Sequence, residues 1–182
     1  TIPPMTYLMI DGSGAPEGDA YAQALAALYP LAYGLKFLLK PRGHDFVVPP
    51  LDSLWWADDP TAFARNQSDA WQWRAMIRLP DSVTRDDLEL IRTKALAKGS
   101  GPAPQVFQSV RLDMLNEGDC LQTLHIGPYS AEAPVLAKLH DEIMPELGVT
   151  FAGHHHEIYL SNPRRTAPEK LKTILRQPVR PV

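Results

Sequence analysis

The apolar residues of this chain recur with two different periods, and each period predicts a different kind of element. Alternation is clearest in 71–80, where Trp71, Trp73 and Ala75 fall on one face and arginines fall on the other, as in a half-buried strand. Apolar residues at helical spacing mark 130–148 instead. We expect strands at 5–14, 34–40, 71–80, 120–130 and near 179, a hairpin in 149–163, and helices at 18–33, 84–99 and 130–148.

Polar residues at the ends of these segments support two of the helices. Thr84 and Asp87 have the spacing of a capping box at the start of 84–99, and Gly99 is suited to end that helix. For the helix at 130–148 we expect Ser130 as the N-cap residue.

The order of the elements repeats along the chain. In both halves a strand and a glycine turn precede a helix that ends near a proline, and a hairpin follows. An offset of 115 residues aligns the two halves, and such a constant offset indicates an internal repeat. It pairs Gly12 with Gly127, Ala24 with Leu139, Leu28 with Ile143 and Pro30 with Pro145.

This repeat predicts the fold class and the domain organisation. We expect a single α+β domain over 1–182, in which two strand-helix-hairpin repeats form one antiparallel sheet with helices on one side. Repeat one is placed at about 5–57, an insert at 58–105 and repeat two at about 106–179. A ligand cleft is expected between the repeats.

Composition narrows the class of protein. The chain has 182 residues, 45% hydrophobic and 21% charged, with a net charge of −3. These values fit a globular protein, monomeric or homodimeric, without direct contact to nucleic acid or a membrane. The start of the chain lacks the pattern of a signal peptide, and one cysteine allows no internal disulfide, so we expect a cytoplasmic location.

The segment GHHHEIYLSNP (153–163) is the most unusual stretch, because three histidines precede a glutamate. Side chains alternate between the two faces of a strand, so His155, Glu157 and Tyr159 share one face and His156 points to the other. The three histidines therefore cannot converge on one ion, and we expect neither a metal nor an organic cofactor.

Glu157 is the strongest candidate for catalysis, with Tyr159 beside it as the second catalytic candidate and His155 on the same face as a candidate for ligand binding. A carboxylate beside Tyr159 is able to act as a general base toward water, and burial among aromatic rings would raise its pKa. The alternative is a glutamate on an exposed strand, or one that pairs with Arg164 or Arg165.

Aromatic residues are the second kind of candidate. The faces of Trp55, Trp71 and Trp73 suit a flat conjugated ligand, although each is equally suited to core packing. Tyr33 and Tyr129 are candidate hydrogen-bond donors. His125 is expected to be structural, and Cys120 has no activating base near it in the sequence.

Several of these segments resemble the GyrI-like small-molecule-binding family, in particular its stand-alone branch. The resemblance rests on LYPLAYGLKFLLK, PLDSLWW, WQWRAMIRLP, LHIGPY and HHEIYLSNPRRTAPEKLKTILRQPV. It implies a concave pocket lined by aromatic residues, with Glu157 as the inward glutamate. Stand-alone relatives of this kind hydrolyse cyclopropane-bearing, DNA-alkylating natural products, which implies a planar aromatic or electrophilic small molecule as partner.

Two other functions remain open from the sequence. The chain could be a binding module that sequesters or senses drugs, with Glu157 as a counter-charge only. It could also modulate DNA gyrase as a protein partner, although it has neither a strongly basic patch nor an appended helix-turn-helix.

Overall fold

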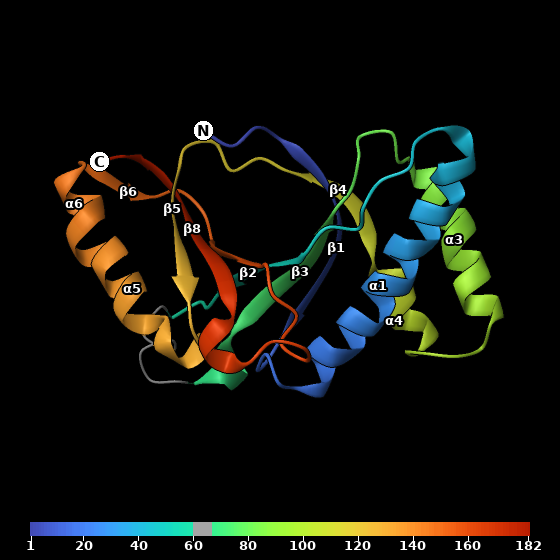
Figure 1. Ribbon diagram of the computed structural model, residues 1–182, viewed down its shortest axis with the longest axis horizontal. Helices are drawn as coiled ribbons and strands as arrows, with labels where there is room; N and C mark the ends of the chain where they lie inside the picture. The colour runs from blue at the N-terminus through green and yellow to red at the C-terminus, as the bar shows by residue number, and fades with distance from the viewer. Residues whose placement is uncertain (60–66) are drawn as a thin grey trace. The chain divides into compact units, whose positions relative to one another are not determined.

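The computed structural model describes residues 1–59 and 67–182 of the chain (Figure 1). Part of the insert expected at 58–105 lies outside these residues. The chain forms two compact units, which we describe separately. The N-terminal unit comprises Met5–Pro49 and Trp55–Leu115, and the C-terminal unit comprises Thr1–Pro4, Pro50–Leu54 and Asn116–Val182.

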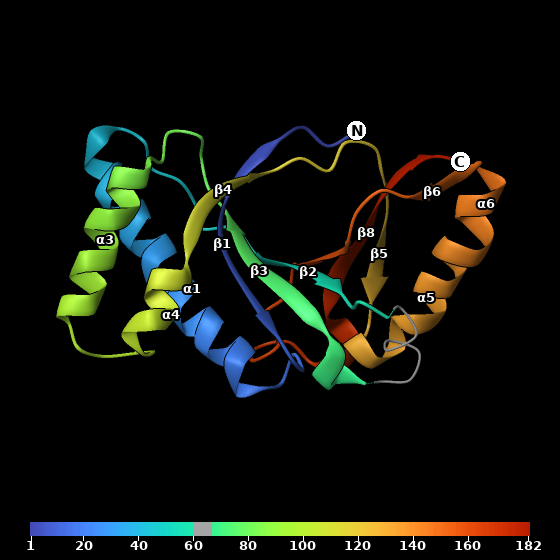
Figure 2. The ribbon, with the colours of Figure 1, turned by 180° about the vertical axis from the view of Figure 1, so that it is seen from behind.

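The N-terminal unit is built on β1 (Met5–Ser13), which lies between two antiparallel partners. These partners are β3 (Gln72–Arg78) and β4 (Arg111–Leu115). Helix α1 (Asp19–Leu39) packs on β1 and β3. Helices α3 (Arg85–Ala97) and α4 (Pro104–Ser109) lie beside α1 in both ribbon views (Figures 1 and 2).

Two predictions about this unit are resolved differently by the structure. The capping box is confirmed, because the Thr84 hydroxyl accepts from the Asp87 backbone N–H while the Asp87 carboxylate accepts from the Thr84 N–H. The strand expected at 34–40 is wrong, since α1 continues to Leu39. A short apolar run fits a buried helix turn as well as a strand, and here Leu31, Leu35 and Leu39 continue the buried face of the helix.

Helix α1 is also more apolar than the sequence pattern suggested. By length and composition alone, the helical stretch Asp19–Arg42 would be able to cross a membrane, whereas the composition of the whole chain led us to expect no contact with one. Its buried side, which includes Leu28, Leu31 and Leu35, packs in the core of the N-terminal unit as the core helix of a globular domain does.

A close contact between β1 and β3 fixes the position of one tryptophan. Gly12 lies opposite Trp73, and a Cβ atom at Gly12 would come within 2.2 Å of the indole ring. The absence of a side chain at residue 12 therefore lets the ring lie flat over the neighbouring strand. Trp73 is 2% exposed, as expected for a residue of the core.

The C-terminal unit is built on β8 (Lys172–Pro181), which pairs antiparallel with three strands. These are β5 (Cys120–Ile126), β6 (Val149–Phe151) and β7 (His155–Tyr159). The hairpin expected in 149–163 is wrong, because β6 and β7 each pair with β8. The predicted α+β class with antiparallel strands is confirmed, while the repeat boundaries and the cleft stay predictions.

One continuous helical stretch connects β5 to β6. It begins with the short turn η3 (Tyr129–Ala131) and ends before Gly148. Ser130 is not its N-cap, because it lies inside η3 and Glu132 occupies the cap position of the following helix without a side-chain hydrogen bond. The rest consists of α5 (Ala133–Ala137), the π-helical segment η4 (Lys138–Ile143) and α6 (Met144–Glu146).

The remaining described elements are short. The strand β2 (Leu51–Trp56) has residues in both units, since Leu54 belongs to the C-terminal unit and Trp55 to the N-terminal unit. Three 3-10 turns complete the description: η1 (Lys40–Arg42), η2 (Ser68–Ala70) and η5 (Pro168–Lys170).

Candidate functional site

The strand β7 places its alternate side chains as the sequence predicts. His155 and Glu157 share one face, with 3.4 Å between His155 Nε2 and Glu157 Oε1. Each of these two side chains is 15% exposed. His156 points to the opposite face and is fully buried. Glu157 is therefore a half-buried carboxylate inside the C-terminal unit, and neither Arg164 nor Arg165 is among its ion-pair partners in the described residues.

A second carboxylate, which sequence reasoning missed, lies close to Glu157. Glu132 comes from the start of α5 and is only 5% exposed. Burial, and then the negative charge of Glu157, raise the pKa of Glu132 to about 8. Glu132 therefore holds a proton at neutral pH, beside an acid whose charge makes that proton hard to remove.

The groups around Glu132 do little to lower its raised pKa. The Thr173 hydroxyl on β8 lowers the pKa of Glu132, but by less than burial and Glu157 raise it. Neither Glu132 Oε1 nor Thr173 Oγ1 has a hydrogen-bond partner of good geometry among the described residues. Buried polar atoms without partners are uncommon, and at a pocket they are available to a ligand or a water molecule.

Two tyrosines flank the carboxylates, and we call Glu132, Glu157, Thr173, Tyr129 and Tyr159 together the acidic site. The rings of Tyr129 and Tyr159 meet edge to face, with centroids 5.6 Å apart. Burial, Glu132 and Glu157 raise the pKa of Tyr129, so its hydroxyl stays protonated and able to donate. The acidic site therefore offers one carboxylate as an acceptor and two protonated groups as donors.

The three predicted tryptophans, Trp55, Trp71 and Trp73, lie in the N-terminal unit and form a continuous cluster there with a tyrosine. Tyr21 from α1 contacts both Trp55 and Trp73, at centroid distances of 5.4 and 5.1 Å. Trp55 in turn contacts Trp71 at 6.1 Å. Trp55 and Trp73 are buried and Trp71 is half-buried. Tyr21 was missed by the sequence analysis, and its apolar helix position gave no sign of this contact.

The other candidates are placed as follows. Tyr33 lies on α1 and is 46% exposed. His125 is buried, with Nε2 3.2 Å from the Pro128 carbonyl oxygen, which fits a structural role. Burial, and then the charge of Glu117, raise the pKa of the Cys120 thiol to about 11. A thiol with so high a pKa is a poor nucleophile at neutral pH.

The face of β7 opposite to Glu157 carries a buried network of charged side chains. His156 Nδ1 and Arg176 Nη1 each lie 2.8 Å from a carboxylate oxygen of Glu117. His156 Nε2 lies 3.5 Å from Asp52. Arg176 also donates to Gln122. The pairing of Glu117 with Arg176 could not be predicted, because the two residues are 59 positions apart and meet only when β5, β7 and β8 assemble.

The ionisation of Glu132 makes the stability of the folded protein depend on pH, and a substitution that cannot ionise should remove this dependence. Its pKa is raised from 4.5 to about 8, so the folded state binds a proton more tightly than the unfolded state, and stability falls as the pH rises from 4.5 toward 8. We expect Glu132→Gln, which cannot ionise, to gain stability relative to the parent protein over that range. Urea unfolding at pH 5 and pH 8 measures the free energy of unfolding of both proteins. If parent and variant differ by the same amount at both pH values, the assignment of the raised pKa to Glu132 is contradicted.

The structure is that of an α+β protein in which two neighbouring carboxyl groups, Glu132 and Glu157, lie beside a pair of tyrosines. The model of the GyrI-like small molecule binding domain matches residues 1–180, and the chain belongs to this family. No curated protein matches it.

Solved structures support the same assignment. The chain is 39% identical to a hydrolase from Listeria innocua, with a TM-score of 0.84, over 98% of this chain and 89% of that one. An uncharacterized conserved protein from Listeria innocua is also 39% identical, with a TM-score of 0.88 and the same coverage. The C-terminal domain of EcmrR is 11% identical, with a TM-score of 0.63 over 100% of this chain and 94% of that one, and shares the fold.

Proposed function

We propose that this protein hydrolyses electrophilic, cyclopropane-containing, DNA-alkylating compounds by water attack assisted by Glu157, and thereby detoxifies them. The observation that carries the proposal is the pair Glu132 and Glu157, one protonated at neutral pH and the other a negative neighbour. Such a division of protonation states between two acids is the usual basis of acid–base catalysis. The hydrolases from Listeria innocua, at 38–39% identity, support a hydrolytic reaction.

The reaction that we propose conserves atoms and electrons as follows. Glu157 takes a proton from water while the water oxygen bonds to the exposed carbon of the cyclopropane ring. The C–C bond of the ring breaks, and its electron pair passes into the conjugated dienone to give a phenolate. A proton from Glu132 or the Tyr129 hydroxyl neutralises the phenolate, and the proton on Glu157 restores the donor. These steps use neither a metal nor an organic cofactor.

Of the remaining candidates, Tyr159 would assist the reaction and the others would bind the ligand. Tyr159 packs against Tyr129 and would hold its hydroxyl in place, and His155 lies next to Glu157. Trp55, Trp71 and Trp73 remain the candidates for stacking against a planar ligand, and Trp71 is the most accessible of them. Tyr33 remains a candidate donor.

A non-catalytic binding protein is the second candidate function, and one observation favours it. Among the described residues, neither Glu132 nor Glu157 forms an ion pair with a lysine or arginine. A half-buried carboxylate without a cation is also a suitable counter-charge for a cationic drug.

Turnover separates these two functions. The protein, at catalytic amount, is incubated with a spirocyclopropyl dienone in ¹⁸O-labelled water, and the ring-opened alcohol is followed by mass spectrometry. We expect many equivalents of labelled alcohol per protein. One equivalent of bound, unreacted compound would instead support the binding function.

A further inference from the structure

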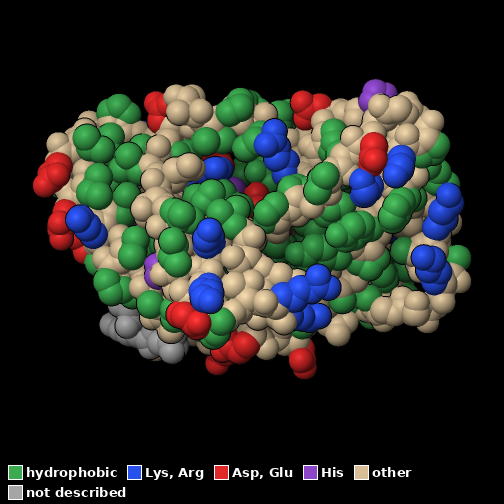
Figure 3. Space-filling view, viewed as in Figure 1, with side chains coloured by type: hydrophobic (Ala, Val, Ile, Leu, Met, Phe, Trp, Pro, Cys, Tyr) green, Lys and Arg blue, Asp and Glu red, His purple; other side chains and the backbone are tan. Residues whose placement is uncertain are grey.

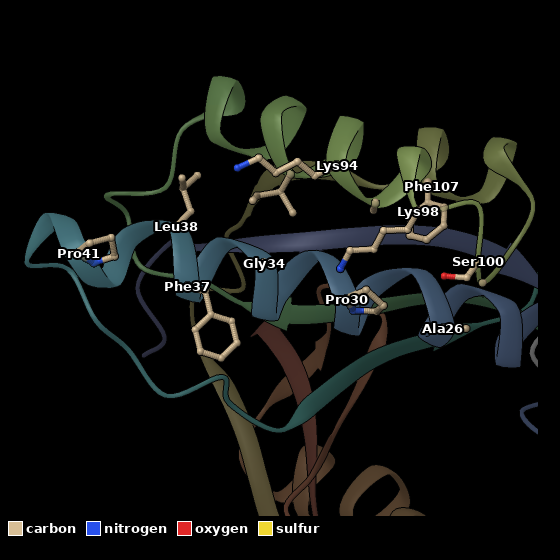
Figure 4. Close-up of a pocket in the computed structure, with 13 residues that line it drawn as sticks. Ala26, Pro30, Gly34, Phe37, Leu38, Pro41, Lys94, Lys98, Ser100 and Phe107 are labelled. Carbon is tan, nitrogen blue, oxygen red and sulfur yellow. The ribbon is translucent and has the colours of Figure 1, made fainter.

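The N-terminal unit has a groove that the acidic site and the aromatic cluster do not include. It lies between α1 and α3 and has a volume of about 660 Å³ (Figure 4). Ala26, Pro30, Gly34 and Leu38 form its α1 side, at the spacing of one helix face. Ile91 and Ala95 contribute from α3. The volume falls within the usual range for small-molecule sites.

The shape of the groove favours an extended chain over a compact ring system. Along α1 the distance from Ala26 to Leu38 is roughly 18 Å at the usual helical rise. The two helices approach closely in the middle, where a Cβ atom on Gly34 would come within 2.4 Å of Ile91. The groove is therefore long, narrow and apolar, as an acyl chain requires.

The polar part of the groove is positive. Lys94 and Lys98 both line it, one helical turn apart on α3 and its C-terminal cap. Neither lysine forms an ion pair with another residue in 1–59 or 67–182, and the lining contains no Asp or Glu. In Figure 4 the Lys98 side chain extends from α3 toward Pro30 on α1.

The surface around the groove is apolar as well. Phe37, which belongs to the lining, is 63% exposed. In Figure 3, hydrophobic side chains gather over α1 and α3, with lysine or arginine side chains at their edge. Exposed apolar surface next to fixed charge is characteristic of ligand-binding and interaction sites.

We propose that this groove binds an amphipathic anion of the fatty-acid class. The acyl chain lies along α1 between Ala26 and Leu38, and the carboxylate lies between Lys94 and Lys98. In Figure 4 the two ammonium groups point in different directions, but lysine side chains are long and flexible enough for both to turn toward one carboxylate and donate charge-assisted hydrogen bonds to it. This proposed site shares no residue with the proposed hydrolytic site, so the two proposals are tested by separate experiments.

Isothermal titration with laurate below its micelle concentration tests the proposal. We expect saturable one-to-one binding to the intact protein, and no comparable binding of dodecyltrimethylammonium, which has the same chain and the opposite charge. Lys94→Glu/Lys98→Glu should weaken laurate binding by about tenfold or more. Ala26→Trp, at an exposed position, should block the apolar half of the groove.

Controls decide between this ligand and other occupants. Lys170→Glu changes an exposed lysine outside the groove and should leave laurate binding unchanged. Laurate affinity that both groove variants retain would overturn the proposal, as would the absence of saturable binding. Binding only to anionic phospholipid vesicles, or only to an acidic amphipathic peptide, would overturn it in favour of a docking surface. Circular dichroism confirms that each variant is folded.

Discussion

Glu157→Gln is expected to lower the turnover of a spirocyclopropyl dienone by roughly 10²–10⁴-fold, the usual cost of losing a general base. Glutamine keeps the size of the side chain and most of its hydrogen bonding, but it cannot accept the proton from water. Binding of an uncharged planar ligand should change little, because no charge on that ligand faces residue 157. Single-turnover rates and the dissociation constant of a non-reactive analogue measure the two quantities separately.

Two further variants sharpen this test. Glu132→Gln should abolish the loss of activity that we expect for the parent protein as the pH rises through about 8, where Glu132 loses its proton. Glu169→Gln changes an exposed glutamate of η5 and serves as the matched control. Undiminished hydrolysis by Glu157→Gln would refute the catalytic assignment, and weaker binding of cationic ligands alone would support a counter-charge.

The second large effect is on stability, from Glu117→Gln. The Glu117 side chain is 3% exposed and lies 2.8 Å from both His156 Nδ1 and Arg176 Nη1. Removing its charge leaves two buried cationic groups with less compensation, which typically costs about 3–5 kcal/mol. Urea unfolding at pH 6 should show a lower midpoint with an unchanged slope. Glu169→Gln is again the control, and a change below about 1 kcal/mol would show that the network contributes little.

The same network sets the pH range of maximal stability. Burial alone would lower the pKa of His156, but the neighbouring carboxylates of Asp52 and Glu117 raise that pKa above 6.5. Its contribution is therefore complete below pH 6.5 and is lost as the pH rises through the raised value. Burial alone would raise the pKa of Glu117, but His156 and Arg176 lower it below 4.5. The contribution of Glu117 to stability is complete above pH 4.5 and is lost at lower pH. Glu117→Gln should therefore lower the free energy of unfolding most between pH 4.5 and pH 6.5, where both contributions are complete.

The alternation of side chains along β7 could be predicted because it depends only on local geometry. Once 155–159 is a strand, Glu157 and His156 must point to opposite faces. The capping box at Thr84 was predictable for the same reason, since both partners lie within one helical turn. The 34–40 segment failed because a short apolar run does not distinguish a helix from a strand, and packing on β1 decided the matter.

Burial and long-range pairing could not be predicted from the sequence. Glu132 has an ordinary position before a helix, and only the assembly of α5 with β7 and β8 brings it near Glu157 and removes it from water. Its position in the sequence gave no sign of this role, because Ser130 was the residue expected to cap the helix. Glu117 and Arg176 likewise meet through strand pairing, and no spacing rule connects them.

The two faces of β7 should evolve under different kinds of selection. On one face His156, held by Glu117, anchors the strand in the core, so substitutions there would be removed by selection for stability. On the other face Glu157 and Tyr159 are partly exposed, and the charge of Glu157 opposes the ionisation of the buried Glu132 instead of compensating a buried cation. A lineage could therefore alter the chemistry of the acidic site by changing alternate residues, while the anchoring residues between them stay constant and keep the protein folded.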